Sequence, residues 1–158
     1  MGQPIVHFEI SGHDPQKLRS YYGDLFGWEF DTSAPVAETI SQRGNYGFVN
    51  RDTSDDGVGI PGGVGGGPSY NSHAIFYVGV PNVGIALQNA ERLGGTRVMS
   101  PVKNPGRDLM VAHFTDPEGN LIGLVCCEAC NMALMRSMWI CVSFAHKDSP
   151  GHIVFHRK

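Results

Sequence analysis

Two short alternating segments, residues 5–10 and 74–80, carry titratable side chains among apolar ones: His7 and Glu9 in the first and Tyr77 in the second, with His73 directly before it. Alternation of this kind predicts β-strands in which every second side chain points to the same face. A histidine that titrates near neutral pH beside a carboxylate can transfer protons, or it can orient a ligand through hydrogen bonds. The sequence leaves these two roles open. One predicted face carries His7, Glu9, His73, Ile75 and Tyr77.

We expect this face to line a mostly apolar pocket to which a few polar groups give specificity. Trp28 either lines the pocket or seals the core. No serine or cysteine stands in a setting typical of a nucleophile, so no catalytic role is assigned. The predicted ligand-binding residues are His7, Glu9, Trp28, Tyr46, Phe48, His73, Tyr77 and His113.

The elements that carry these residues are repeated in the sequence. Phe8 corresponds to Phe76 and Asp14 to Asn82, an offset of 68 positions that needs no gap. Each copy has an alternating segment, a polar or proline-marked turn, and a stretch of helical period that a glycine ends. Asp14 can cap free N–H groups of the first helix, and Pro15 suits its first turn. A duplicated unit is therefore expected.

Three short β-rich segments follow each predicted helix. They lie near residues 28–30, 39–42 and 46–50 in the first copy and 96–100, 110–115 and 121–125 in the second. The order of strand, helix and three strands, found twice, predicts an α+β fold. We expect two tandem βαβββ modules that form a half-open mixed β-barrel with a concave cleft.

A glycine-rich stretch separates the two copies. It lacks the Lys-Ser/Thr pair of a phosphate-binding loop, so we predict a flexible linker at residues 62–70 that could also act as a lid. The predicted domain covers residues 1–125, with module one at 4–61 and module two at 71–125.

Three stretches resemble the vicinal oxygen chelate superfamily of glyoxalase, bleomycin-resistance and extradiol-dioxygenase proteins. They are HFEISGHDPQKLRSYYGDLFGWEF at residues 7–30, FYVGVPNVGIALQNAERLGG at 76–95 and the hairpin HFTDPEGNLIGLV at 113–125. The resemblance implies a small-molecule site on the concave face. It does not indicate one particular activity.

Many members of this superfamily hold a divalent metal with His or Glu side chains from the first and last strands of each module. Carried over to this chain, those positions give His7, Ile75 and Gly123, and the first module has no acid or imidazole in its last strand. We therefore expect no metal or other cofactor. A relocated metal site built from His7, His73 and Glu9 is the remaining option.

The segment from residue 126 to 158 differs from the rest of the chain, since it holds all four cysteines. Cys127 and Cys130 with His152 and His156 have pair spacings compatible with zinc. Alternatively, an apolar stripe at helical spacing could dock on the barrel or on a second subunit. A divergent extension without defined structure is the third option. The stripe consists of Met135, Met138, Trp139 and Val142.

Composition limits the classes of partner. The net charge is −3 without a run of Lys or Arg, which does not favour nucleic acid or an anionic membrane. Neither a secretory signal nor an apolar run of about 20 residues is present, so a cytoplasmic protein is expected. The segment at residues 126–158 and the expected fold favour a homodimer.

The sequence favours a metal-independent protein that binds a small organic molecule, or an enzyme of unassigned reaction. The first alternative is a metal-dependent lyase, isomerase or dioxygenase that uses His7. The second is a non-catalytic protein-interaction module, which predicts a shallow or plugged cleft.

Overall fold

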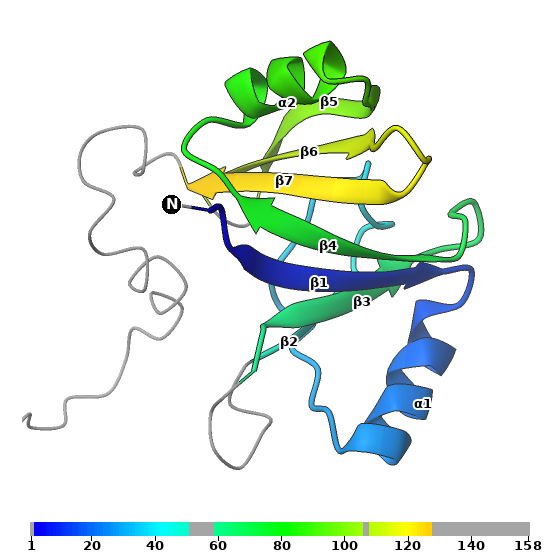
Figure 1. The fold of residues 1–158 in the computed structure, drawn as a ribbon. Helices are drawn as coiled ribbons and strands as arrows, with labels where there is room; N and C mark the ends of the chain where they lie inside the picture. Colours follow the sequence, from blue (N-terminus) through cyan, green and yellow to red (C-terminus); the bar gives the residue numbers. More distant parts are fainter. Residues whose placement is uncertain (1, 51–58, 106–107, 128–158) are drawn as a thin grey trace, which may run out of the picture.

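A computed structural model describes residues 2–50, 59–105 and 108–127. One mixed sheet of seven strands, not closed into a barrel, runs through the molecule in the order β2-β3-β1-β4-β7-β6-β5 (Figure 1). The helices are α1 (Pro15–Phe26) and α2 (Val83–Arg92). The strands are β1 (Ile5–Gly12), β2 (Gly47–Val49), β3 (Gly62–Gly66), β4 (His73–Gly79), β5 (Thr96–Asn104), β6 (Leu109–Thr115) and β7 (Leu121–Cys127).

The two copies of the repeat pair with each other inside one chain. β1 and β4 are antiparallel neighbours at the centre of the sheet, with Phe8 opposite Phe76. In each half the last strand lies parallel to the first, since β3 pairs with β1 and β7 with β4. The α+β fold expected from the sequence is confirmed, and each half begins with a strand followed by a helix, as predicted.

The helix starts also follow the repeat. The Asp14 side chain accepts a hydrogen bond from the Lys17 N–H at 3.0 Å, and Asn82 accepts one from the Ile85 N–H at 2.9 Å. These bonds satisfy N–H groups that have no partner within the first turn. Gly27 ends α1 in the left-handed conformation that glycine adopts without strain.

The first module has fewer strands than predicted. Residues 39–42 form a turn and bend rather than a strand, and the segment near 28–30 contributes only an isolated bridge between Asp31 and Phe48. The predicted linker at 62–70 is also wrong, because its first five residues form β3 next to β1. Glycine has a low propensity for strands, so the sequence did not predict one here. In this strand the glycines leave space for neighbouring rings.

The sheet has two different faces. The outer face packs against α2 through a cluster that includes Val83, Leu87, Ala112 and Leu124. On the inner face, Val36 and Ile40 from the segment between α1 and β2 are buried against the sheet. The inner face, where the sequence predicts a cleft, is therefore packed with side chains along much of its length. Its other cluster members are Tyr46, Phe48, Ile75, Tyr77 and Val111.

Residues 128–158 lie outside the described part of the chain, and so do the predicted zinc ligands Cys130, His152 and His156 and the apolar stripe. Within the described residues, neither helix has the length and apolar character needed to span a lipid bilayer.

Candidate functional site

A row of inner-face residues crosses five neighbouring strands. Register pairs join His7 in β1 to Tyr77 in β4, Tyr77 to Gly123 in β7, Gly123 to His113 in β6, and His113 to Met99 in β5. Because register partners point to the same face, the sheet places two imidazoles and a phenol in one line.

Glu9 lies one inner-face position along β1 from His7 and is almost fully buried, with 2% of its surface exposed. Two tyrosine hydroxyls donate hydrogen bonds to the same carboxylate oxygen, Oε2: Tyr77 at 3.1 Å and Tyr46 at 3.3 Å. The tyrosines come from β4 and from the residue before β2, so three parts of the chain meet at this oxygen. Donors fixed in this way orient the carboxyl group.

Each tyrosine in turn contacts a histidine. The Tyr46 hydroxyl lies 3.0 Å from His7 Nε2, and the Tyr77 hydroxyl lies 2.8 Å from His113 Nε2. Because each hydroxyl has one proton and gives it to Glu9, the imidazole nitrogens are assigned as donors to the phenol oxygens. A continuous hydrogen-bonded chain thus runs from His7 through Glu9 to His113.

Two glycines make room for the tyrosine rings. A Cβ added at Gly63 would lie 2.2 Å from the Tyr46 ring, and one at Gly123 would lie 2.4 Å from the Tyr77 ring. Gly63 pairs with Glu9, and Gly123 pairs with Tyr77. The missing side chains in β3 and β7 therefore allow the phenols to lie across these strands.

Burial shifts the titration of this network. Burial raises the pKa of Glu9 to about 7, although the hydrogen bonds from Tyr77 and Tyr46 act in the opposite direction. Burial, with a smaller contribution from the charge of His73, lowers the pKa of His113 to about 4. Glu9 therefore changes charge near neutral pH while His113 remains neutral.

Three buried polar atoms in the described residues have no hydrogen-bond partner: Glu9 Oε1, Ser11 Oγ and His73 Nε2. They lie in one corner of the inner face. Glu9 and Ser11 are two residues apart in β1 and so share a face, and Ser11 pairs with His73 in β4. Glu9 Oε1 and His73 Nε2 are 4.0 Å apart. Unpartnered buried atoms are uncommon in folded proteins, so this corner is a candidate binding point.

Seven of the eight residues predicted to bind a ligand have their side chains on or beside this face. Trp28 does not: its ring packs on the other side of β1, 5.3 Å from the Phe8 ring and 5.2 Å from the Phe26 ring. It belongs to an aromatic cluster with Tyr22 and Phe26 of α1. Sequence reasoning missed Ser11, although its position two residues after Glu9 was a sufficient signal.

The donor atoms of His7 and His113 are not arranged around a common metal position. Within the described residues no three His, Cys, Asp or Glu side chains converge as a metal would require. The histidine nitrogens of His7 and His113 that point inward contact phenols instead. At Gly123, the position of a last-strand ligand in the superfamily, the Tyr77 ring occupies the space that a ligand side chain would need.

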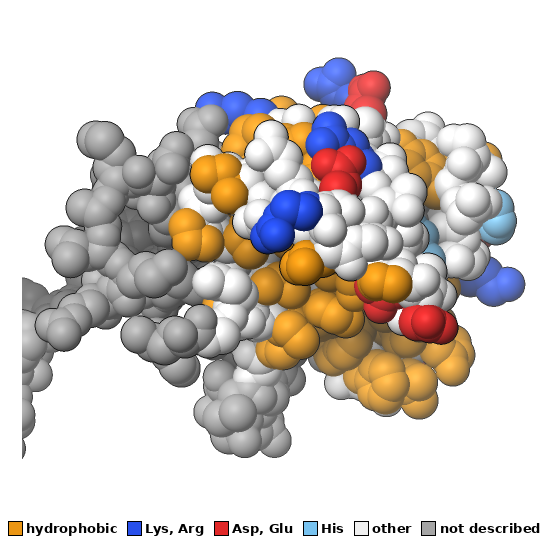
Figure 2. Space-filling view, turned by 45° about the horizontal axis from the view of Figure 1, so that its top comes forward, with side chains coloured by type: hydrophobic (Ala, Val, Ile, Leu, Met, Phe, Trp, Pro, Cys, Tyr) orange, Lys and Arg blue, Asp and Glu red, His pale blue; other side chains and the backbone are white. Residues whose placement is uncertain are grey.

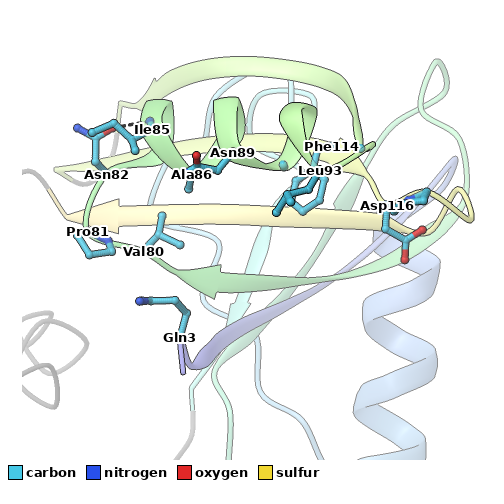
Figure 3. A pocket seen from close by; sticks show the side chains of 13 residues that line it. Gln3, Val80, Pro81, Asn82, Ile85, Ala86, Asn89, Leu93, Phe114 and Asp116 are labelled. Carbon is cyan, nitrogen blue, oxygen red and sulfur yellow. Dashed lines mark hydrogen bonds between the residues drawn. The ribbon is translucent and has the colours of Figure 1, made fainter. Parts of the chain in front are cut away.

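A concavity lies on the outer face, away from Glu9. It is an open groove of about 580 Å³ beside α2, with walls that include Val80, Ile85, Leu93 and Phe114 (Figure 3). Ile85 and Leu93 are largely exposed. Other apolar side chains are exposed on this surface as well (Figure 2). The groove has few titratable side chains and suits packing better than proton chemistry.

Comparison with known protein families identifies the superfamily. The Glyoxalase/Bleomycin resistance protein/Dioxygenase superfamily profile matches residues 4–124. The chain belongs to this superfamily. No curated protein matches the chain.

Solved structures of the superfamily fold resemble the chain at low sequence identity. A variant of methylmalonyl-CoA epimerase from Streptomyces coelicolor, solved with 2-nitronate-propionyl-CoA, has a TM-score of 0.58 and 16% identity, covering 80% of this chain and 98% of that one. A hypothetical protein from Bacillus halodurans has a TM-score of 0.57 and 13% identity, with 80% and 95% covered. The Mycobacterium tuberculosis methylmalonyl-CoA epimerase has a TM-score of 0.56 and 12% identity, covering 78% of this chain and 87% of that one. These similarities support the fold alone.

Proposed function

We propose that this superfamily member binds a small organic molecule at the inner-face corner of Glu9 and His73, without a metal ion, and exchanges a proton with it. One observation carries the proposal. Glu9 is held by two tyrosines through one oxygen, while its other oxygen has no partner and faces an imidazole nitrogen that also has none.

The arrangement suits acid–base chemistry. A general acid or base works best when its pKa lies near the working pH, and burial brings the pKa of Glu9 to about 7. The free oxygen, Oε1, is the atom from which a proton would leave or at which it would arrive. The His73 side chain is 29% exposed, so a ligand reaches Oε1 from the His73 side once the imidazole turns outward.

The metal-free part of the proposal rests on side chains that are present. A carboxylate or imidazole at Gly123 or Gly63 would collide with a tyrosine ring. The donor set is thus arranged for hydrogen bonds between protein groups rather than for metal coordination.

A second candidate is a non-catalytic protein-interaction module, and one observation favours it. Val36 and Ile40 pack over the inner face where the sequence predicts an open cleft. This candidate predicts that no small molecule stabilises the protein.

A thermal-shift screen of chelator-treated protein tests both candidates. The panel contains carbonyl compounds, carboxylic acids and acyl-CoA thioesters, including methylmalonyl-CoA, which one of the structural relatives binds in its crystal. We expect at least one compound to raise the Tm of the wild type and to have little effect on Glu9→Gln. Stabilisation that needs added metal, or equal stabilisation of both proteins, contradicts the proposal. No stabilisation by any compound favours the interaction module.

The cytoplasmic location and the homodimer remain predictions. Sedimentation velocity measures the oligomeric state directly.

A further inference from the structure

The corner beside Glu9 contains a pair of acceptors without a proton between them. His73 Nδ1 lies 3.0 Å from the Asn71 carbonyl oxygen, which can only accept. Nδ1 therefore carries the hydrogen in the neutral ring, and Nε2 presents a lone pair. That lone pair faces Glu9 Oε1 at 4.0 Å. When Glu9 is ionised and His73 neutral, both facing atoms are acceptors.

A water molecule does not resolve this arrangement. Glu9 Oε1 and His73 Nε2 are both inaccessible to solvent, so no water-sized space adjoins them. The remaining ways to satisfy both atoms are a proton shared between them or a ligand donor that enters when His73 moves. His73 is able to move, because its side chain is partly exposed and its ring is held through a hydrogen bond to the Asn71 carbonyl oxygen.

We propose that Glu9 and His73 share one proton and that His73 carries it between the buried carboxyl group and the exterior of the site. A small rotation of the imidazole shortens the 4.0 Å gap to hydrogen-bond distance. The O–H bond of Glu9 then breaks as an N–H bond forms at Nε2, which leaves a carboxylate and an imidazolium. The imidazolium gives up the same proton to the ligand or to water when the ring turns outward, and the reverse sequence returns it.

The surroundings of Glu9 leave His73 as the group suited to this role. Tyr46 and Tyr77 both bind Oε2 and are donors in the network. The Nε2 atoms of His7 and His113 lie against the hydroxyls of these tyrosines. Ser11 is buried, at 2% exposure, and a serine hydroxyl does not titrate in the neutral range. Among the described residues, His73 has a ring nitrogen 4.0 Å from Oε1 and a side chain that reaches the surface.

This inference rests on the proposed function in one respect, that Glu9 is the proton-exchanging group. It assigns His73 as a residue that acts through Glu9. The two proposals can fail separately, because the test below uses protein without any ligand.

The test is an NMR pH titration of the full chain with 13C-labelled glutamate carboxyl groups and 15N-labelled imidazoles. Loss of one signal in Glu9→Gln assigns the Glu9 resonance, and loss of one in His73→Phe assigns His73. Coupled sites titrate with shared midpoints. We expect the Glu9 curve to show two steps, one of which coincides with the His73 Nε2 curve.

In His73→Phe we expect the Glu9 curve to become a single step, and its signal to broaden because proton exchange slows. The matched control is His13→Gln, since His13 is an exposed histidine that contacts a backbone carbonyl away from Glu9. That variant should titrate like the wild type at Glu9.

Two results overturn the inference: a single Glu9 step in the wild type that His73 does not share, or a Glu9 curve and line width unchanged in His73→Phe. If His73→Phe does not fold, the coincidence of steps in the wild type still decides, with His73 assigned through His73→Gln. A ligand that stabilises the wild type but leaves these curves uncoupled supports the proposed function and contradicts this inference.

Discussion

Glu9 is a carboxyl group whose two oxygens have different surroundings. Oε2 receives two phenol hydrogens, which stabilise the ionised form, while burial of the whole group favours the protonated form. The balance leaves the pKa at about 7 rather than 4.5. His113 at the other end of the network is shifted in the opposite sense, to about 4 from 6.5.

The pH dependence of stability follows from these two shifts. Folded Glu9 keeps a proton that the unfolded chain releases, so its contribution to the free energy of unfolding falls as pH rises from 4.5 to 7. His113 does the reverse, since the unfolded chain takes up its proton first, and its contribution rises between pH 4 and 6.5. Each amounts to about 3 kcal/mol at most.

We predict that the two effects largely cancel in the wild type between pH 4.5 and 6.5. Glu9→Gln removes one of them, so its free energy of unfolding should rise with pH over this range relative to the wild type. His113→Gln should show the opposite slope. Urea unfolding at a series of pH values measures both, and difference curves that stay parallel to the pH axis would contradict the shifts.

Tyr77→Phe tests the hydrogen-bonded chain. The change removes the hydroxyl that joins Glu9 to His113, leaves His113 Nε2 buried without a partner, and should destabilise the fold by about 1–3 kcal/mol. Tyr21→Phe is the matched control, because Tyr21 is 58% exposed, and it should have little effect. Equal changes in the free energy of unfolding would show that the Tyr77 hydroxyl has no structural role.

At the scale of elements, the site depends on glycines in the strands beside it. β3 and β7 flank the central pair β1–β4, and the glycines at 63 and 123 let phenols lie across them. The alternation of His7 with Glu9 and of His73 with Tyr77 could be predicted, because a strand has a period of two residues. The glycine-rich strand could not, because its value lies in the rings it accommodates rather than in its own propensity. The placement of Trp28 on the inner face was wrong for a related reason. The local sequence does not show on which side of β1 the chain passes after α1.

Gly123→Ala tests the space above β7. Its Cβ would lie 2.4 Å from the Tyr77 ring, so the ring must shift away from His113, at a cost of about 1–3 kcal/mol. In Gly23→Ala, within α1, the new Cβ meets only the Trp28 carbonyl oxygen, at 3.4 Å. We expect that control to be neutral or stabilising by about 0.5–1 kcal/mol. Thermal unfolding of both variants provides the comparison, and a neutral Gly123→Ala would show that Tyr77 has room to move.

At the scale of the whole molecule, the duplicated unit brings equivalent positions of the two copies together. Phe8 and Phe76 are equivalent in the repeat and opposite each other in β1 and β4. Glu9 and Tyr77 are likewise equivalent, and they form a hydrogen bond. The duplication could be predicted from caps and spacing, since both act locally. The covering of the inner face by Val36 and Ile40 could not, because it depends on where a long connection crosses the sheet.

The most direct test of the account is isothermal titration calorimetry of a stabilising ligand from the thermal-shift screen with chelator-treated protein at pH 7. Measurements in buffers of different ionisation enthalpy give the number of protons exchanged on binding. We predict binding without metal, together with a net proton exchange that Glu9→Gln abolishes. Binding that requires metal, or the same proton exchange in Glu9→Gln, would contradict it.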